Sequence, residues 1–371
     1  MKNRLYYLLS ILCGLIIVCS EGLVFSSQIV SFQEPALFPS LISSIRVDEP
    51  LDFCGEPVPV HIFDIKERLE KELLLSIWNR PQVILWIKRA GQFFPHIERM
   101  LKQYNMPDDL KYIPIVESAL RAHAGSSKGA IGFWQFMKAT GKRYDLTVNQ
   151  YTDERRNLFA STLAAINYLK DLYVQFQSWS LAAAAYNMGE DGLETEIITQ
   201  KVKDYYKLYL PLETQRYIFK IISAKLIMSN PSRFGFWIKD SDIYPALQFD
   251  RIRLHCIHET PVQIIAESAN TFLKDIKDLN PEIRGYYLPK GHHTLLIPLG
   301  QSQFFHKKFD KLITEWQSSQ KEHIYIVQQG DNLSNIAERF NVPLPALLIW
   351  NRLSLRKHIH PGDRLIIYPH K

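Results

Sequence analysis

An internal repeat constrains the fold of this chain more than any other feature of its sequence. Residues 261–298 align with residues 332–369 at a constant offset of 71 residues, without a gap. In each copy a strand precedes a helix with periodic apolar residues, a second short helix ends at an Asn, and a Pro/Gly turn leads into a closing strand. The pattern predicts two copies of one compact βααβ unit. The identical pairs are Ile265/Ile336, Ala266/Ala337, Glu267/Glu338, Asn270/Asn341, Asn280/Asn351, Gly291/Gly362 and Pro298/Pro369.

The part of the chain before the repeat is predicted to be mainly helical. Apolar residues recur at helical spacing from residue 63 to about residue 237, and helices are expected at residues 158–176, 179–187 and 213–229. Proline at positions 81, 95 and 107 stands where helices could start or stop, so residues 83–101 are expected to contain two helices.

Residues 1–20 have the features of an export signal. Lys2 and Arg4 supply a positive start, an apolar run covers residues 5–18, and small residues suited to cleavage follow. The run is short for a membrane span, which needs roughly 20 residues, but an uncleaved anchor stays an alternative. Cys19 raises lipid attachment as a further alternative, which the bulky Val18 disfavours. We expect an exported protein of the periplasm or cell envelope, with membrane attachment through the N-terminus left open.

The composition is that of a protein with one or more buried cores. Of the 371 residues, 46% are hydrophobic and 22% are charged, and the formal net charge is +6. Because no block rich in lysine or arginine stands behind this charge, nucleic acid is not expected as a partner. Cys54 and Cys256 would remain after cleavage of the signal, and either a disulfide or two separate buried thiols is compatible with the sequence. No Cys/His spacing is typical of a metal site, and no cofactor is implied.

Residues 110–135 contain the first candidate for chemistry. Ile113, Val116 and Leu120 are predicted to fall on one face of a short helix. Glu117 lies on the flank of that face. A carboxyl group against apolar neighbours is partly desolvated, which raises its pKa and keeps it protonated near neutral pH. Glu117 is therefore a candidate general acid.

Two further stretches place small residues beside groups that suit a sugar. Residues 126–132 contain two Ser and two Gly, which predicts a loop whose backbone a ligand can approach closely. Aromatic and amide side chains follow at residues 134–136. Residues 180–189 contain four consecutive alanines, which let a helix pack closely, and a final glycine that caps it and places Tyr186 and Asn187 at the helix end.

These stretches resemble the lytic murein transglycosylases with a goose-type lysozyme-like fold. The resemblance rests on Glu117-Ser118, on Gly-x-x-Gly-x-Trp-Gln at residues 129–135 and on Ala-Tyr-Asn-x-Gly at residues 185–189, in the expected order and spacing. With Pro107 to Tyr112 and Glu213-Thr214-x-Arg216-Tyr217, residues 60–235 are similar to the membrane-bound lytic murein transglycosylase D subgroup.

The resemblance implies a role for six residues. Glu117 would be the catalytic acid and then the base. For Tyr217 a role as a buried aromatic residue is almost equally favoured. The residues that would contact the substrate are Ser126, Gln135, Tyr186, Asn187 and Tyr217.

The second copy of the repeat, from Tyr325 through Gly330-Asp331 to Pro361-Gly362-Asp363, resembles a LysM peptidoglycan-binding module. The first copy has Glu259-Thr260 in place of Gly330-Asp331 and is expected to be a degenerate LysM-like module. Glycan binding and a role as a packing spacer both stay open for it.

One strong catalytic carboxyl group is found, whereas a glycoside hydrolase normally uses two. A single acid and base fits cleavage of the β-1,4 bond between N-acetylmuramic acid and N-acetylglucosamine with formation of a 1,6-anhydro end. The alternatives are a muramidase-type hydrolase, a catalytically inactive peptidoglycan-binding protein and a plain helical interaction domain. The candidate second carboxylates, none of them in a pattern typical of catalysis, are Asp108, Asp109, Asp145, Asp153 and Glu154.

The expected architecture is a multi-domain α+β chain. A signal peptide or anchor covers residues 1–20 and an extended lead-in covers residues 21–60. A mainly α lysozyme-like transglycosylase domain covers residues 61–237, and the two small βααβ modules cover residues 250–299 and 323–369. The expected partner is the glycan strand of peptidoglycan, and the sequence predicts no oligomeric state.

Overall fold

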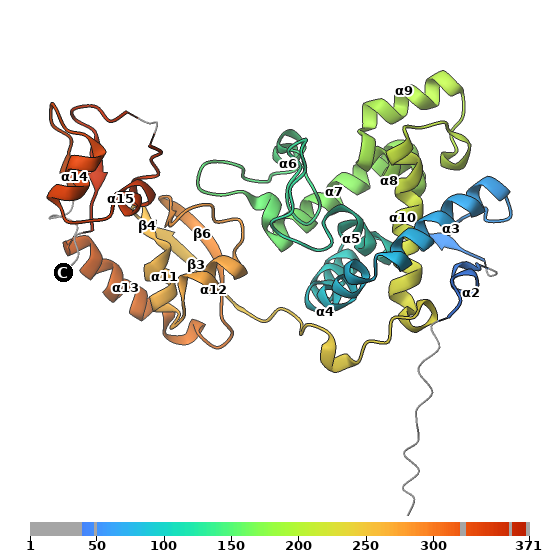
Figure 1. Ribbon diagram of the computed structural model, residues 1–371, viewed down its shortest axis with the longest axis horizontal. Coiled ribbons are helices and arrows are strands. Elements are labelled where there is room, and N and C mark those ends of the chain that lie inside the picture. The colour runs from blue at the N-terminus through green and yellow to red at the C-terminus, as the bar shows by residue number, and fades with distance from the viewer. Residues whose placement is uncertain (1–38, 48–49, 320–323, 356–357, 369–371) are drawn as a thin grey trace, which may run out of the picture. The chain divides into compact units, whose positions relative to one another are not determined.

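The computed structural model describes residues 39–47, 50–319, 324–355 and 358–368. By its contacts the chain divides into two units, Met1–Pro39 and Ser40–Lys371, and the second contains every element below (Figure 1). The predicted signal or anchor and residues 21–38 of the lead-in lie outside the described residues. None of the helices in the described part is both long and apolar enough to cross a membrane.

Helices dominate residues 40–237. The strands β1 (Asp52–Phe53) and β2 (Glu56–Pro57) pair with each other near the start. Short 3₁₀ helices join the longer ones at η1 (Asp108–Tyr112), η2 (Glu154–Arg156), η3 (Tyr205–Lys207), η4 (Pro231–Phe234) and η5 (Asp240–Asp242). The α-helices are α2 (Leu41–Ile45), α3 (Phe63–Trp78), α4 (Arg80–Gln103), α5 (Ile113–Ser118), α6 (Lys138–Arg143), α7 (Leu158–Phe176), α8 (Trp179–Met188), α9 (Glu190–Gln200) and α10 (Leu212–Ser229).

Helix α10 lies in the centre of this helical core, where it contacts α3, α5 and α8 (Figure 1). Its apolar residues Ile218, Ile221 and Ile222 are fully buried. Helix α8 packs closely on α7 and α10 because the four alanines at residues 182–185 are fully buried and bring little side-chain bulk. The core therefore forms around the helices that carry Tyr186 and Tyr217.

The three helices predicted with bounds are confirmed as α7, α8 and α10, each to within one residue at either end. The expected break between two helices within residues 83–101 is wrong, because α4 continues through Pro95 as a single helix. A proline lacks the amide that would bond the carbonyl four residues earlier, so α4 continues through Pro95 without that one bond.

The strap, residues 239–249, lies along α4 and leads to the first module. Its amides at residues 244 and 247 donate to two carbonyls of α4, each at 3.1 Å. The strap also lies directly against Gly91, where an added Cβ would come 2.2 Å from Cγ2 of Ile243. The strap is therefore bound along α4 rather than being a free linker.

The first module is built on two long antiparallel strands. Strand β3 (Asp250–Cys256) pairs along its whole length with β6 (Gly291–Ile297). Between them come β4 (Thr260–Pro261), α11 (Val262–Ser268), α12 (Leu273–Leu279) and β5 (Tyr287–Leu288). Helix α13 (Ser302–Ser319) follows and adds Phe305 and Phe309 to the core of this module, which the repeat did not predict.

The second module consists of β7 (Ile324–Ile326), α14 (Leu333–Arg339), α15 (Leu344–Asn351) and β8 (Arg364–Ile366), with β7 antiparallel to β8. The predicted order of strand, two helices and closing strand is therefore confirmed in both copies.

The repeat contains one gap that the sequence alignment missed. Asn280 bonds the main chain of Leu296, and its equivalent Asn351 bonds the main chain of Ile366 in the same way. Leu296 and Ile366 are therefore equivalent, and they stand 70 positions apart instead of the 71 of the gapless alignment. That alignment paired Ile366 with Leu295, which is wrong. The gap falls between the Asn at the end of the second helix and the bonded residue of the closing strand.

The predicted fold class, a mainly α domain followed by two small βααβ modules, is confirmed. Cys54 and Cys256 are both free thiols, so the disulfide alternative is wrong. Within the described ranges, no group of three or more His, Cys, Asp and Glu residues could hold a metal ion.

Candidate active site

Glu117 stands in the last turn of α5, which ends abruptly. Ala119 and Leu120 have left-handed backbone conformations, with φ of 54° and 58°, so the helix stops at Ser118. The prediction that Leu120 shares a helical face is therefore wrong, although the turn still buries its side chain. The Ser118 hydroxyl donates to the carbonyl of Phe133 at 2.8 Å, which joins the end of α5 to the loop that follows.

Glu117 is half-buried, and the removal of water from around its carboxyl group raises its pKa to about 7. Tyr217 opposes the effect, because its hydroxyl donates to Oε1 of Glu117 and favours the carboxylate. The charge of Glu213 raises the pKa further, and the charge of Lys220 lowers it. A group that gains and loses its proton near neutral pH can act first as an acid and then as a base.

Glu213, Tyr217 and Lys220 all lie on one side of α10, because they are four and three residues apart. Tyr217 is buried, Lys220 is half-buried and Glu213 is exposed. Tyr217 was predicted at the site from the sequence, whereas Glu213 and Lys220 were not predicted as neighbours of Glu117. Helical spacing from Tyr217 was the signal that could have identified both.

Four of the carboxylates considered from the sequence are engaged elsewhere. Asp108, Asp109 and Asp153 each form an ion pair with a Lys or Arg side chain, at 2.6, 2.8 and 2.8 Å. Glu154 accepts a main-chain amide at 2.6 Å. Glu213 is the carboxylate whose charge acts on the candidate acid.

Tyr186 lies beside Glu117 at the end of α8. Gly189 ends that helix as predicted, with φ of 93°. The Tyr186 hydroxyl donates to the carbonyl of Trp134 at 2.7 Å. Burial first, and then the charge of Glu117, raise the pKa of Tyr186 well above its ordinary value. The tyrosine is therefore neutral and held close to the acid.

Gln135 and Asn187 line a cavity of about 440 Å³ together with Tyr186. Asn187 is held by the hydroxyl of Thr214, which donates to its Oδ1 at 2.8 Å. Gln135 Nε2 donates to main-chain carbonyls of its own loop, at 2.8 and 3.2 Å. Ser126 is exposed, and its hydroxyl accepts a main-chain amide of the same loop at 3.0 Å. Both residues therefore shape the loop on which they stand.

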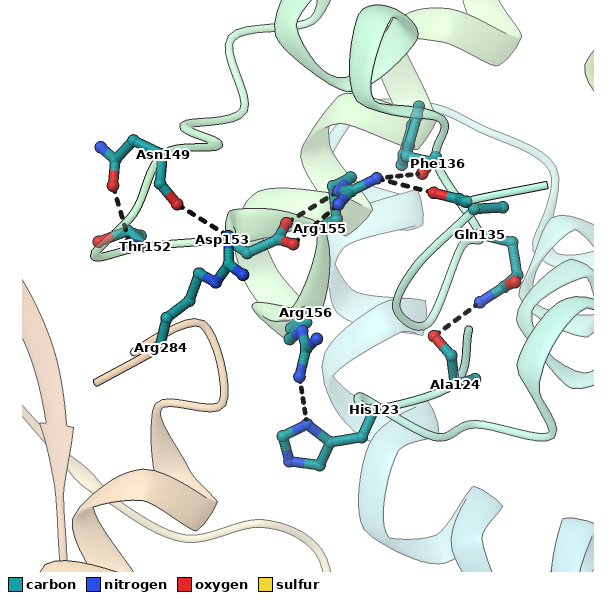
Figure 2. A network of polar contacts seen from close by, with 12 residues as sticks. His123, Ala124, Gln135, Phe136, Asn149, Thr152, Asp153, Arg155, Arg156 and Arg284 are labelled. Atoms are coloured by element: carbon teal, nitrogen blue, oxygen red, sulfur yellow. Dashed lines mark hydrogen bonds and ion pairs between the residues drawn. The ribbon is translucent and has the colours of Figure 1, made fainter. Parts of the chain in front are cut away.

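The active-site loop, residues 124–136, is held against Arg155 (Figure 2). The guanidinium of Arg155 donates to the carbonyls of Gly129 and Phe136 at 3.1 and 3.2 Å. A Cβ on Gly132 would lie 1.7 Å from the carbonyl oxygen of Arg155. On the side where Gly132 lacks a Cβ, the close approach is therefore made by the protein's own main chain.

Together these residues provide one carboxyl group that titrates near neutral pH, two tyrosine hydroxyls beside it, and an adjoining cavity with amide side chains. Such a site can transfer a proton to the leaving oxygen of an uncharged polar ligand and can hydrogen-bond its amide groups.

Two family models match the chain. The Transglycosylase SLT domain matches residues 94–209, a range that contains Glu117, Gln135 and Tyr186. The LysM domain matches residues 325–367, which cover the second module.

Among curated proteins, the membrane-bound lytic murein transglycosylases D of two Escherichia coli strains are each 31% identical to this chain over 329 residues. The match covers 85% of this chain and 72% of each relative. Among solved structures, an inactive mutant of the lytic transglycosylase Slt from Pseudomonas aeruginosa is 22% identical, over 39% of this chain and 23% of that one, with a TM-score of 0.26. From its identity to the curated relatives over most of both sequences, this chain belongs to the family of the membrane-bound lytic murein transglycosylases D.

Proposed function

We propose that this member of the family cleaves the β-1,4 bond between N-acetylmuramic acid and N-acetylglucosamine and leaves a 1,6-anhydro end. The observation that carries the proposal is the half-buried Glu117, bonded by Tyr217, whose pKa of about 7 suits it to both proton transfers. The match to the transglycosylase domain and the name of the curated relatives support peptidoglycan as the substrate.

Each step of the reaction uses Glu117. The protonated side chain donates to the glycosidic oxygen, and the bond from that oxygen to C1 of the muramic acid breaks. The substrate's own N-acetyl carbonyl supports the positive charge at C1. The Glu117 carboxylate then takes the proton of the C6 hydroxyl, whose oxygen bonds to C1 and closes the anhydro ring. Glu117 ends in its acid form, and no water is consumed.

The neighbouring residues have different parts in this mechanism. Tyr217 stabilises the Glu117 carboxylate that exists between the two proton transfers, through the hydrogen bond to Oε1. Gln135, Tyr186 and Asn187 line the adjoining cavity, where amide and hydroxyl groups suit the acetamido groups of the glycan. Ser126 would contact the substrate from the exposed turn of the active-site loop.

Hydrolysis by a muramidase mechanism is the second candidate, and Glu213 is the observation that favours it. Many glycosidases use a second carboxylate to activate water, and the charge of Glu213 acts on Glu117. Glu213 is exposed on α10, so water has access to it.

We further propose that the second module binds glycan strands and that the enzyme acts in the periplasm. The LysM match supports contact with peptidoglycan outside the catalytic domain. The relatives are named as membrane-bound, which supports a site of action at the cell envelope.

Mass spectrometry of the muropeptides released from purified peptidoglycan tests the proposal, with the full chain beside a Glu117→Gln variant. We expect anhydro-ended products, each one water lighter than the hydrolysed form, and none from the variant. Reducing ends that disappear in a Glu213→Gln variant would establish a muramidase instead. Binding without any product would establish an inactive peptidoglycan-binding protein.

A further inference from the structure

The first module contacts the catalytic helices through its main chain. The docking edge, residues 282–284, pairs antiparallel with residues 151–153. The amides of Asp153 and Arg284 each donate to a carbonyl across this pair, at 2.9 and 2.8 Å. The Arg284 side chain also donates to the main-chain carbonyl of Asn149 at 3.1 Å (Figure 2).

The docking edge is fixed within its own module. Ile283 is 4% exposed, and Asn280, three residues earlier, is fully buried with its side chain bonded to the closing strand. The strap anchors the same module at a second place, along α4. Two separate attachments prevent the module from turning about a single linker.

Arg155 connects the docking edge to the active-site loop. The amide of Asp153 bonds the docking edge, and its carboxylate accepts two hydrogen bonds from Arg155, each at 2.8 Å. Burial alone would raise the pKa of Asp153, but the bonds and charge of Arg155 hold it below its ordinary value, so the pair is charged. The remaining nitrogen of the guanidinium donates to carbonyls at residues 129 and 136 of the active-site loop.

The active-site loop in turn contacts the neighbours of the acid. The carbonyl of Phe133 accepts the hydroxyl of Ser118, which follows Glu117 directly in the chain. The carbonyl of Trp134 accepts the hydroxyl of Tyr186. A continuous series of packed and hydrogen-bonded groups therefore runs from the docking edge to the catalytic carboxyl group.

We propose that the first module is a brace for the active site and that Arg155 is the positioning residue through which it acts. The expected change in kcat rests on the proposed function, whereas the expected change in hydrogen exchange of the active-site loop does not. A fixed brace explains why the first copy of the repeat is kept although Glu259-Thr260 replaces the Gly-Asp pair of the second copy.

Point variants of the full chain distinguish two roles of the first module, as a brace for the active site or as a glycan-binding module. Arg284→Pro removes one of the two main-chain amide donors at the docking edge, in a segment between α12 and β5 that belongs to neither element. Arg155→Lys keeps the charge beside Asp153. A single ammonium group cannot bond both oxygens of Asp153 and both loop carbonyls at once, as the three guanidinium nitrogens do. Arg253→Ala is the matched control, because Arg253 is an exposed arginine on β3 of the same module.

We expect Arg284→Pro and Arg155→Lys to lower kcat about 10- to 100-fold, since a displacement of about 1 Å in a catalytic site has a cost of this size. The KM for peptidoglycan and the pH at which activity falls should stay unchanged. Hydrogen exchange of the amides of residues 126–136 should become faster in both variants, and Arg253→Ala should behave as the wild type.

Two results would overturn the proposal. One is a folded Arg284→Pro variant, by circular dichroism, whose active-site loop exchanges at the wild-type rate. The other is weaker sedimentation with peptidoglycan at unchanged kcat, which would show that the module binds glycan. A failure of the proposed function is distinguishable, because the wild-type chain would then release no anhydro products while the exchange experiment still reports on the brace.

Discussion

Tyr217 donates its phenolic hydrogen to Oε1 of Glu117 from a position 100 residues later in the chain. This bond stabilises the carboxylate, whereas the enclosure of Glu117 by protein stabilises the neutral acid. The two effects oppose each other, and enclosure is the larger, which leaves the pKa of Glu117 at about 7. The balance between them determines how the activity depends on pH.

Activity should fall as the pH rises through about 7. The first proton transfer requires protonated Glu117, whose pKa lies at about 7 instead of its ordinary 4.5. Above that pKa the protonated fraction falls about tenfold per pH unit. The measurement is kcat/KM on solubilised glycan strands between pH 5 and pH 9. A fall that begins near pH 5 would contradict the removal of water from around the acid.

Tyr217→Phe should move this fall in activity to higher pH by about one to two units. Removal of a hydrogen bond to a charged group costs about 1.5–3 kcal/mol, and here the loss affects the carboxylate form alone. The value of kcat should also decrease, because the carboxylate formed during the reaction loses its donor. The measurement is the same pH profile, with Tyr209→Phe as a control because Tyr209 is 82% exposed. A move to lower pH would contradict the direction of the hydrogen bond.

Glu282→Gln should stabilise the protein at alkaline pH. Burial raises the pKa of Glu282 from 4.5 to about 7, against hydrogen bonds from its own main chain and from Asn157 that lower it, and the charge of Glu154 adds a small further rise. Because the folded pKa lies above the unfolded one, the wild type loses stability as the pH rises from about 4.5 to about 7, up to about 3 kcal/mol.

The Glu282→Gln variant lacks this loss, so its advantage should be present at pH 8 and absent at pH 4. Urea unfolding at the two pH values measures the difference. Glu267→Gln is the control, because Glu267 is an exposed glutamate of the same module. Equal pH dependence of the wild type and the Glu282→Gln variant would show that Glu282 is solvated.

Asn280→Ala should destabilise the first module by about 2–3 kcal/mol. Its side-chain amide is fully buried and bonds both the amide and the carbonyl of Leu296, at 2.8 and 2.7 Å. Alanine would leave buried main-chain groups without partners, at about 1–3 kcal/mol each. Thermal unfolding followed by circular dichroism measures the effect, and Thr294→Ala, at an exposed position of β6 in the same module, is the comparison. Equal effects of the two substitutions would contradict the role of the buried amide.

Periodic patterns predicted the elements that bury one face. The bounds of α7 and α10 follow from apolar spacing, because a helix in a core must repeat its apolar residues every three or four positions. Pro95 misled the prediction, because a single proline indicates a break by local sequence alone, whereas α4 continues through it.

The candidate site was predictable only in part. Glu117 and Tyr186 stand in local motifs, whereas the contact of Glu117 with α10 depends on how the helices pack. The docking edge had no signal in the sequence, because its bonds use main-chain groups that every residue except proline possesses.

The number of residues in the strap is fixed, because the strap is bonded to α4 and the first module after it is bonded at the docking edge. One residue inserted between positions 244 and 247 would advance the chain by about 3.3 Å, which exceeds the tolerance of the two main-chain bonds at the docking edge. A relative that keeps those bonds should therefore have a strap of the same number of residues. Differences in chain length between such relatives should gather in exposed turns outside the strap.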